Sequence, residues 1–254
     1  MLKNLIITLL LLSSVDASQR DSITLGTEDW SPFSFKDKKT QQISGLSTEI
    51  IYETFKRMDV KIRSNRIMPW ARTQKSGYIG KFDAIYTASM NDTRLKYMYF
   101  PKEPIISSKW VLFIKKENKS KLKFDDFNSL NGKKICLING YNYPKFFKKH
   151  IEKYSKITLT SKENLNIGKL LNNRCDYMPA VLETTIDMTK SNIDLQKVDA
   201  YKHIYYFDKP LFVSKFYLMF SKKTVSKEFV DRFSDRLEEF KKTQQYQDIL
   251  SKYL

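Results

Sequence analysis

The spacing of apolar residues changes several times along the first half of the chain. In the stretch "LSTEIIYETFKRM", apolar residues such as Leu46, Ile50 and Phe55 recur at the spacing of one helix face. Shorter apolar runs that end at glycine or polar residues are typical of strands. The pattern predicts strands at 23–25, 60–67 and 82–89 and helices at 46–58 and 69–81. Strands that alternate with helices indicate a parallel sheet with helices on its faces.

The same alternation returns in the second half of the chain. A strand at 109–116 precedes a charged and polar stretch, after which a second series of strands and helices begins. This series has predicted strands at 134–140, 156–160 and 175–181 and predicted helices at 143–154 and 161–173. The remaining predicted elements are a strand at 211–223 and amphipathic helices at 227–242 and 244–254. The predicted fold class is therefore α/β, with two units of mainly parallel sheet.

The first segment of the chain has the pattern of an export signal. The stretch "MLKNLIITLLLLSSVDAS" has a lysine, an apolar run over 5–12, and Val15 and Ala17 at the positions of a cleavage site. We therefore expect residues 1–17 to be a signal peptide and the mature protein to be periplasmic. The alternative is an uncleaved membrane anchor, but an apolar run of eight residues is too short to span a bilayer.

The net charge of +17 raises the question of a nucleic-acid or membrane-surface partner. The lysines are scattered through the whole chain in short groups, and no basic stripe with interleaved exposed aromatic residues is visible. A hydrophobic content of 41% is typical of a globular protein. We expect a solvated basic surface and no nucleic-acid partner.

The cysteines and histidines do not indicate a metal site. Cys136 and Cys175 are the only cysteines, and an oxidising compartment would allow them to form a bridge. They are far apart in sequence and each begins a predicted strand, so adjacent parallel strands could bring them close. Because nothing in the sequence fixes their distance, we expect two buried free thiols rather than a bridge. His150 and His203 lack ligand spacing to a cysteine, so we expect neither a metal site nor a cofactor.

The order of several segments resembles a known family. The segments are "LGTEDWSPFSF", "GLSTEIIYETFKRM", "GKFDAIYTASMNDTRLKYMYFPKEPI", "FNSLNGKKICLINGYNYP", "LLNNRCDYMPAV" and "FKKTQQYQDILSKYL". Together they are similar to bacterial extracellular solute-binding proteins of family 3, which serve polar amino-acid importers. The resemblance covers nearly the whole mature chain.

The resemblance implies a two-lobed periplasmic-binding-protein fold of the Venus flytrap type. Lobe one would comprise 20–112 plus 209–254, and lobe two would comprise 113–208. The segments "VLFIKK" and "FVSKFYLMF" would be the two hinge strands between them. The implied function is that a monomer captures a small polar, carboxylate-bearing ligand, such as an amino acid, and delivers it to the membrane permease of an ABC importer. A ligand-sensing domain for a membrane receptor is the alternative.

The resemblance also implies roles for residues of lobe one. Arg94, five positions after Ser89, matches the arginine that grips a ligand carboxylate, which a guanidinium can hold through two parallel hydrogen bonds. The alternative for Arg94 is a surface arginine paired with Asp92. Trp30 and Trp70 would form opposite walls of the ligand site, or else belong to the core. Arg72 would be a second anion contact or would bridge to a carboxylate of the lobe.

In lobe two, "GYNYP" lies between a strand and a helix. Tyr141, Asn142 and Tyr143 would therefore present backbone amides and side chains to the cleft. The carboxylate that commonly receives a ligand's α-amine in this family would fall at Val181, where this chain has none. Glu183 is the nearest acid, so either it takes that role or the ligand has no α-amine.

An enzyme on the same fold, acting on small acids as a dehydratase or hydrolase, is a further alternative. General acid–base catalysis needs titratable groups that converge on one site. His150 and His203 lie outside the cleft loops, which leaves the acidic pair Glu28 and Asp29 in "TEDW". One such pair is thin evidence, so we expect no enzymatic activity.

Overall fold

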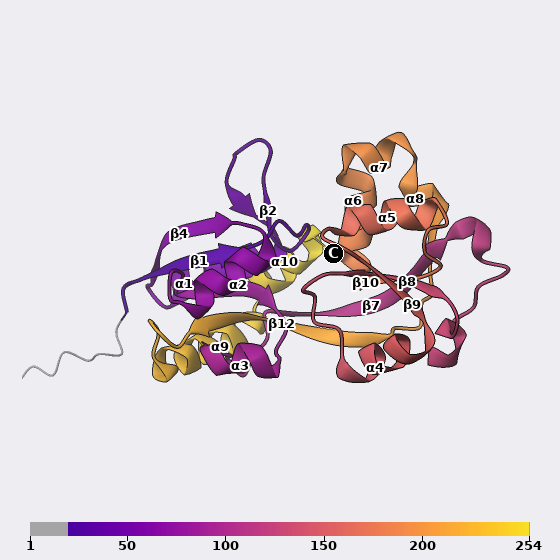
Figure 1. Cartoon of the computed structure of the whole chain (residues 1–254). Coiled ribbons are helices and arrows are strands. Elements are labelled where there is room, and N and C mark those ends of the chain that lie inside the picture. Colours follow the sequence, from indigo (N-terminus) through magenta and orange to yellow (C-terminus); the bar gives the residue numbers. More distant parts are fainter. Residues whose placement is uncertain (1–19, 254) are drawn as a thin grey trace, which may run out of the picture.

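The structure is a computed structural model, and it describes residues 20–253. Figure 1 shows two groups of helices and strands that lie side by side. The long strands β7 (Ile106–Lys115) and β12 (Phe212–Ser221) run from one group to the other. The α/β class predicted from the sequence is confirmed.

The first group is built on a sheet whose central strand is β1 (Ser22–Thr27). β1 pairs in parallel with β4 (Lys61–Ile67) and β5 (Ala84–Ala88), and β5 pairs in antiparallel fashion with the second half of β12. The short strands of this group are β2 (Phe35–Lys36), β3 (Ile43–Ser44) and β6 (Met98–Tyr99). Its helices are α1 (Leu46–Arg57), α2 (Trp70–Tyr78), α3 (Asp92–Tyr97), α9 (Lys227–Lys241) and α10 (Gln244–Tyr253).

The second group contains the parallel strands β8 (Lys134–Ile138) and β9 (Lys156–Thr160). β10 (Met178–Val181) and β11 (Ile204–Tyr206) pair with β7 in antiparallel fashion. The helices of this group are α4 (Lys145–Tyr154), α5 (Glu163–Leu171), α6 (Leu182–Ser191), α7 (Ile193–Lys197) and α8 (Ala200–His203), with 3₁₀ turns η1 (Lys116–Asn118) and η2 (Phe127–Leu130).

The strands β7 and β12 connect the two groups through a short antiparallel ladder. Trp110 lies opposite Phe212, and Ile106 lies opposite Phe216. Beyond this ladder, β7 continues into pairing with β10 and β11, whereas β12 continues into pairing with β5 and β6. Each long strand therefore belongs to both groups.

The C-terminal helices complete the core of the first group. The apolar face predicted for α9 is buried, with Phe229, Phe233 and Phe240 at most 1% exposed. The ring of Phe233 lies 5.0 Å from that of Phe55 in α1 and 5.2 Å from that of Phe220 in β12. The last part of the chain thus packs against the first part because the helical spacing of its phenylalanines gives α9 one apolar face.

The structure contains helices that the sequence pattern did not predict. α6, α7 and α8 lie between Leu182 and His203, a stretch for which no regular element was expected. α6 and α7 meet at Asn192, whose side chain accepts hydrogen bonds from the backbone N–H groups of Asp194 and Leu195. Short helices of this kind depend on capping and tertiary packing, and a periodic apolar pattern is a poor guide to them.

The expectation of two free thiols is wrong, because Cys136 and Cys175 form a disulfide. Both cysteines are buried, as expected. Ile135, at the start of β8, forms a parallel bridge with Tyr177. This pairing brings the two cysteine Cα atoms to 5.8 Å, a separation that a disulfide spans. The sequence did not show that these two segments are neighbours, and the bridge between Ile135 and Tyr177 shows that they are.

The signal peptide expected at 1–17 lies outside the described residues. Within residues 20–253, every helix is too short or too polar to cross a membrane.

Candidate functional site

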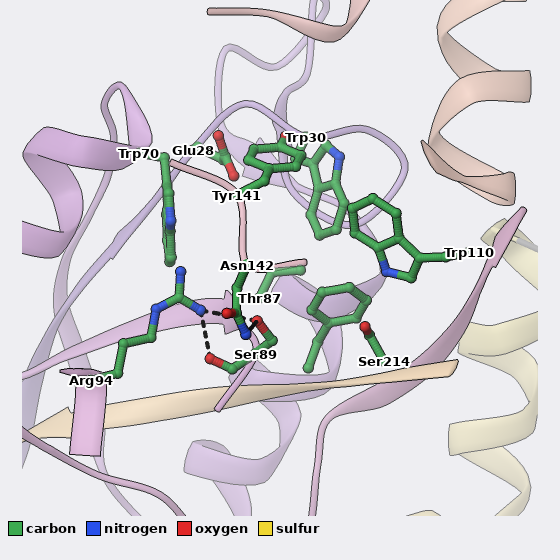
Figure 2. A pocket seen from close by; sticks show the side chains of 11 residues that line it. Glu28, Trp30, Trp70, Thr87, Ser89, Arg94, Trp110, Tyr141, Asn142 and Ser214 are labelled. Carbon is green, nitrogen blue, oxygen red and sulfur yellow. Dashed lines mark hydrogen bonds between the residues drawn. The ribbon is translucent and has the colours of Figure 1, made fainter. Parts of the chain in front are cut away.

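A cavity lies where the two groups of elements meet. Its lining comes from loops after β1 and β5, the first turn of α2, helix α3, the loop before α4, and strands β7 and β12. Figure 2 shows the guanidinium of Arg94 on one side of the site and the rings of Trp30, Trp110 and Tyr141 on the other. The free space measures about 30 Å³, which is room for a water molecule or two. A solute of amino-acid size therefore requires the two groups to move apart.

Arg94 is buried, with 3% of its surface exposed. Its backbone N–H donates to the side chain of Asn91, which caps α3. Nε of the guanidinium donates to Oε1 of Gln74 at 3.1 Å, and Nη1 donates to the carbonyl oxygen and the Oγ of Ser89. The guanidinium carbon also lies 5.2 Å from the centre of the Trp70 ring. Figure 2 shows the guanidinium next to this ring. These contacts fix the orientation of a positive charge inside the cavity.

The alternative of a surface arginine paired with Asp92 does not describe Arg94. Asp92 instead forms an ion pair with Lys145, with 2.6 Å between Oδ2 and Nζ. Because Asp92 belongs to α3 and Lys145 to α4, this ion pair connects the two groups of elements. It leaves the charge of Arg94 available to the cavity.

The backbone bends sharply at the edge of the cavity, at Thr87. Thr87 has a φ of 61°, a left-handed conformation that is costly for a β-branched residue. Its Oγ1 is buried, lines the cavity, and has no hydrogen-bond partner among the described residues. Backbone strain of this kind persists where the surrounding structure enforces it, often at binding sites.

Aromatic rings form most of the remaining wall. The ring of Trp30 lies 5.1 Å from that of Phe216 and 6.3 Å from that of Tyr141. The ring centre of Trp110 also lies 6.3 Å from that of Tyr141. Trp30 also packs on Phe33 at 5.0 Å and is 5% exposed, so it belongs to both the core and the cavity wall.

Asn142 reaches from the second group to the first. Its Nδ2 donates to Oγ of Ser89 at 3.2 Å and to the carbonyl oxygen of Met90 at 3.3 Å. Together with the ion pair between Lys145 and Asp92, these bonds hold the two groups in contact. The structure therefore represents the arrangement in which the cavity is closed.

The structure brings six of the residues proposed from the sequence to the cavity: Trp30, Trp70, Ser89, Arg94, Tyr141 and Asn142. It places three others outside the lining. Arg72 is exposed on α2, and Glu183 lies in the first turn of α6. Tyr143 is buried against Trp110, and its hydroxyl accepts a hydrogen bond from the backbone N–H of Ile138, which is a structural contact.

Sequence reasoning assigned no ligand contact to Glu28 and gave Glu163 no role at all. Glu28 follows β1 and lines the cavity. Burial raises its pKa to about 8; the positive charge of Arg94 opposes this shift, and the negative charges of Glu163 and Asp29 add to it. Glu163 is the first residue of α5 and is 5% exposed. An acid at the start of the helix that follows a parallel strand, as in "KITLTSKE", is the signal that could have identified it.

Burial also raises the pKa of Glu163, to about 7. The polar groups of Thr185, Trp30 and Thr184 oppose this shift. The hydroxyl of Thr185 donates a hydrogen bond to Oε1 of Glu163, whereas the indole N–H of Trp30 is buried without a hydrogen-bond partner among the described residues. The cavity thus combines the fixed cation of Arg94, the carboxyl group of Glu28 and aromatic walls, whereas Glu163 lies outside its lining.

Solved structures show the same fold. A histidine kinase sensor domain with similarity to periplasmic binding proteins is 18% identical, with a TM-score of 0.77, and the match covers 92% of this chain and 96% of that one. An ancestral arginine-binding protein bound to arginine is 21% identical, with a TM-score of 0.74 and coverage of 92% and 99%. The substrate-binding protein of an amino-acid ABC transporter is 18% identical, with a TM-score of 0.69 and coverage of 92% and 99%.

A comparison with curated proteins finds no match. The sequence model of one family, in contrast, matches residues 23–254, which is nearly the whole of the chain. That match agrees with the segment order seen in the sequence and with the fold that the chain shares with the solved structures. The chain therefore belongs to the bacterial extracellular solute-binding proteins, family 3.

Proposed function

We propose that the protein is a periplasmic binding protein that captures a small carboxylate-bearing solute, an amino acid or a close relative, between its two lobes. The observation that carries this proposal is the buried guanidinium of Arg94, which Ser89 and Gln74 hold inside an aromatic cavity. A guanidinium fixed in this way binds a carboxylate with both charge and orientation. The arginine-binding relative supports an amino acid as the solute.

The lobes proposed for this motion are 20–112 plus 209–254 and 113–208. The ladder between Ile106–Trp110 and Phe212–Phe216 lies at the boundary between them and serves as the hinge. Opening breaks the bonds of Asn142 and the ion pair of Lys145, and these contacts re-form when the lobes close. The solute enters in the open form, because the closed cavity has room only for water.

The proposed partner is the membrane permease of an ABC importer, to which a monomer delivers the solute. The relative that serves an amino-acid ABC transporter supports this role. A second candidate is a sensing role in which the closed, ligand-bound form contacts a membrane receptor, and the sensor-domain relative supports it. Binding to a purified permease or to a receptor ectodomain, each with and without solute, separates the two roles.

Binding without turnover is proposed, although the raised pKa values of Glu28 and Glu163 are a feature that binding sites share with general acids. A dehydratase or hydrolase on the same fold would convert its bound acid. Mass spectrometry of the solute after prolonged incubation with the protein decides this point. Recovery of unchanged solute is the expected result, and a new product would establish an enzyme.

The central test is a thermal-shift screen of amino acids and organic acids on the mature chain, unfolded and refolded to remove any bound solute. A solute at about 100 times its Kd stabilises the folded state by about 2.7 kcal/mol. The variant Arg94→Ala is screened in parallel. The proposal predicts a carboxylate-bearing hit that Arg94→Ala loses. A hit without a carboxylate, or one that Arg94→Ala retains, contradicts it.

A further inference from the structure

One face of α2 carries three residues at a spacing of four and turns toward Arg94. Trp70, Gln74 and Tyr78 follow one another by one helical turn, so they lie on the same side of α2. The guanidinium carbon of Arg94 lies 5.2 Å from the centre of the Trp70 ring, and its Nε donates to Oε1 of Gln74 at 3.1 Å. The hydroxyl of Tyr78 donates to the same Oε1 at 3.2 Å. These three residues, the α2 face, therefore form one continuous surface beside the guanidinium.

The helix that carries the α2 face is held firmly in place. Oγ1 of Thr73 donates to the carbonyl oxygen of the last residue of β1 at 3.2 Å. Gly77 packs against β5, where a Cβ atom on the glycine would lie 3.2 Å from the nearest side-chain atom, so the missing side chain lets α2 approach the sheet closely. The ring of Tyr78 stacks on that of Tyr97, the last residue of α3, with 4.7 Å between ring centres. The α2 face is thus fixed both to the sheet and to the helix that carries the guanidinium.

The hydrogen bonds of Arg94 engage two of the three guanidinium nitrogens. Nε donates to Gln74, and Nη1 donates to the carbonyl oxygen and to the Oγ of Ser89. Within residues 20–253, Nη2 donates no hydrogen bond. Because the guanidinium is planar and rigid, the bonds of Nε and Nη1 also determine where Nη2 points. Nη2 is therefore the nitrogen left for an anionic group of the solute.

The acceptors that hold the guanidinium are uncharged. They are the amide of Gln74 and the carbonyl and hydroxyl groups of Ser89, and in the described part of the chain the hydrogen bonds of Arg94 reach no carboxylate. Glu28 contributes a carboxyl group to the cavity lining, but burial raises its pKa to about 8. At neutral pH Glu28 is therefore mostly protonated. The positive charge of Arg94 thus stays available to an anionic group of the solute.

We propose that Gln74 and Tyr78 are positioning residues of the solute site: Tyr78 fixes the amide of Gln74, and Gln74 orients the guanidinium of Arg94 without neutralising it. Both lie outside the cavity lining and act through Arg94. An amide oxygen accepts from two donors at once, which suits this arrangement. The inference rests on the proposed function, because it links the orientation and the charge of Arg94 to capture of a carboxylate.

The substitution Gln74→Glu separates this role from a purely structural one. Glutamate has nearly the shape of glutamine and keeps an acceptor oxygen for Arg94 and Tyr78, and the neighbouring guanidinium keeps it ionised. A charge-assisted hydrogen bond is stronger than a neutral one, so the melting temperature of the ligand-free protein should stay the same or rise. The affinity for the solute should nevertheless fall, because the new carboxylate pairs with the charge of Arg94. A residue that only stabilised the fold would leave the affinity unchanged.

The experiment is calorimetric titration of the refolded mature chain with L-arginine, L-glutamine and glutarate, each of which carries a carboxylate. The probe that binds most tightly is then titrated into the variants Gln74→Glu, Gln74→Leu and Tyr78→Phe and into the double variant Gln74→Leu/Tyr78→Phe. The matched control is Lys75→Gln at an exposed position of α2, which changes the net charge by the same amount as Gln74→Glu. Thermal unfolding of each ligand-free variant accompanies the titrations.

The expected result is that Gln74→Glu weakens binding by about tenfold or more without lowering the melting temperature. Gln74→Leu should weaken binding by about threefold to tenfold and Tyr78→Phe by about threefold. In the Gln74→Leu background, Tyr78→Phe should have no further effect, since Tyr78 acts through Gln74. The control Lys75→Gln should stay within about twofold of the unmutated protein.

An affinity of Gln74→Glu within about twofold of the unmutated protein overturns the inference, whereas the proposed function then stands if Arg94→Ala loses the probe. An equal loss in Lys75→Gln also overturns it, because net charge alone would explain the effect. Full additivity of Tyr78→Phe with Gln74→Leu overturns the role of Tyr78. If Gln74→Glu does not fold, unchanged binding by Gln74→Leu overturns the inference instead. If none of the three probes binds, both proposals fail.

Discussion

Asn142 of lobe two donates a hydrogen bond to the hydroxyl of Ser89 of lobe one, with 3.2 Å between Nδ2 and Oγ. The same hydroxyl accepts a hydrogen bond from Arg94 at 3.1 Å. The same oxygen atom therefore takes part in the contact between the lobes and in the placement of the guanidinium. A carboxylate that binds Arg94 acts on a network that already spans both lobes.

The first prediction concerns this contact. Asn142→Ala removes the hydrogen bonds of the side chain to Ser89 and Met90 and so favours the open form. A typical hydrogen bond contributes about 0.5–1.5 kcal/mol, so we expect the affinity for the solute to fall by roughly twofold to tenfold. Calorimetric titration measures the affinity, and small-angle scattering measures the radius of gyration with and without solute. An unchanged affinity together with an unchanged radius of gyration would exclude a role in closure.

The second prediction concerns Arg94. Loss of a buried, charge-assisted partner typically costs roughly 2 to 5 kcal/mol in affinity. Arg94→Ala should therefore bind the solute about thirtyfold to several thousandfold more weakly. Arg94→Lys should recover only part of this loss, because an ammonium lacks the fork of the guanidinium. The exposed Arg63→Ala, on β4, serves as the matched control and should bind like the unmutated protein. If Arg94→Ala binds within about twofold of the unmutated protein, this residue is not the carboxylate site.

The structure adds a consequence for the stability of the ligand-free protein. The sequence alone predicts no stabilising role for Arg94 in the ligand-free protein. In the structure its guanidinium donates to Gln74 and Ser89, and its removal takes away the donor to the carbonyl oxygen of Ser89, whereas Gln74 keeps its hydrogen bond from Tyr78. Unsatisfied buried groups cost about 1–3 kcal/mol, so Arg94→Ala should also lower the melting temperature of the ligand-free form. Thermal unfolding of both forms separates this effect from the loss of affinity.

Local patterns predicted those parts of the molecule that short-range physics decides. The apolar face of α9 follows from the spacing of Phe229, Phe233 and Phe240, and burial of that face needs no knowledge of its partner. The family resemblance implied the gathering of Ser89, Trp30 and Asn142, which agrees with their places after strands of parallel sheets, where the carboxyl ends meet.

The remaining site residues depend on long-range geometry. Trp110 and Phe216 read as ordinary strand residues, and only the crossing of β7 with β12 turns them toward the cavity. Glu163 and Glu183 are both acids in the first turn of a helix, and the sequence alone does not show that neither of them lines the cavity. The pairing of Cys136 with Cys175 likewise required the neighbouring positions of Ile135 and Tyr177.

The third prediction concerns the disulfide. Its two cysteines have a sequence separation of 39, so the bridge closes a loop of about that length in lobe two. Removal of a native disulfide typically costs 2–4 kcal/mol, so Cys136→Ser with Cys175→Ser should lower the free energy of unfolding by about that amount. Urea titration of the oxidised, reduced and doubly substituted proteins measures the difference. Equal stability of the oxidised and reduced forms would show that the bridge contributes nothing. Affinity for the solute should change little, since neither cysteine lines the cavity.

The last prediction concerns pH and the ligand-free protein. Burial raises the pKa of Glu28 to about 8 and that of Glu163 to about 7, whereas the unfolded chain holds these groups at their ordinary value of 4.5. Between pH 4.5 and about 8, the folded state therefore binds more protons than the unfolded state. Stability falls as pH rises whenever the folded state holds the extra protons. The stabilisation that these two protonated groups contribute is therefore complete below their pKa in the unfolded chain. It is lost once the pH rises above their pKa values in the folded protein.

The ligand-free melting temperature should accordingly decrease from about pH 5 to pH 8. One pKa unit corresponds to about 1.4 kcal/mol, but opening of the lobes returns water to both carboxylates, so the total stays within a few kcal/mol. Glu28→Gln and Glu163→Gln should flatten the profile, because glutamine does not titrate, whereas the exposed Glu152→Gln should leave it unchanged. The measurement is thermal unfolding in a series of buffers at constant ionic strength. A profile that keeps its slope in the double variant would show that other groups cause it, and that the two carboxylates are hydrated in the ligand-free protein.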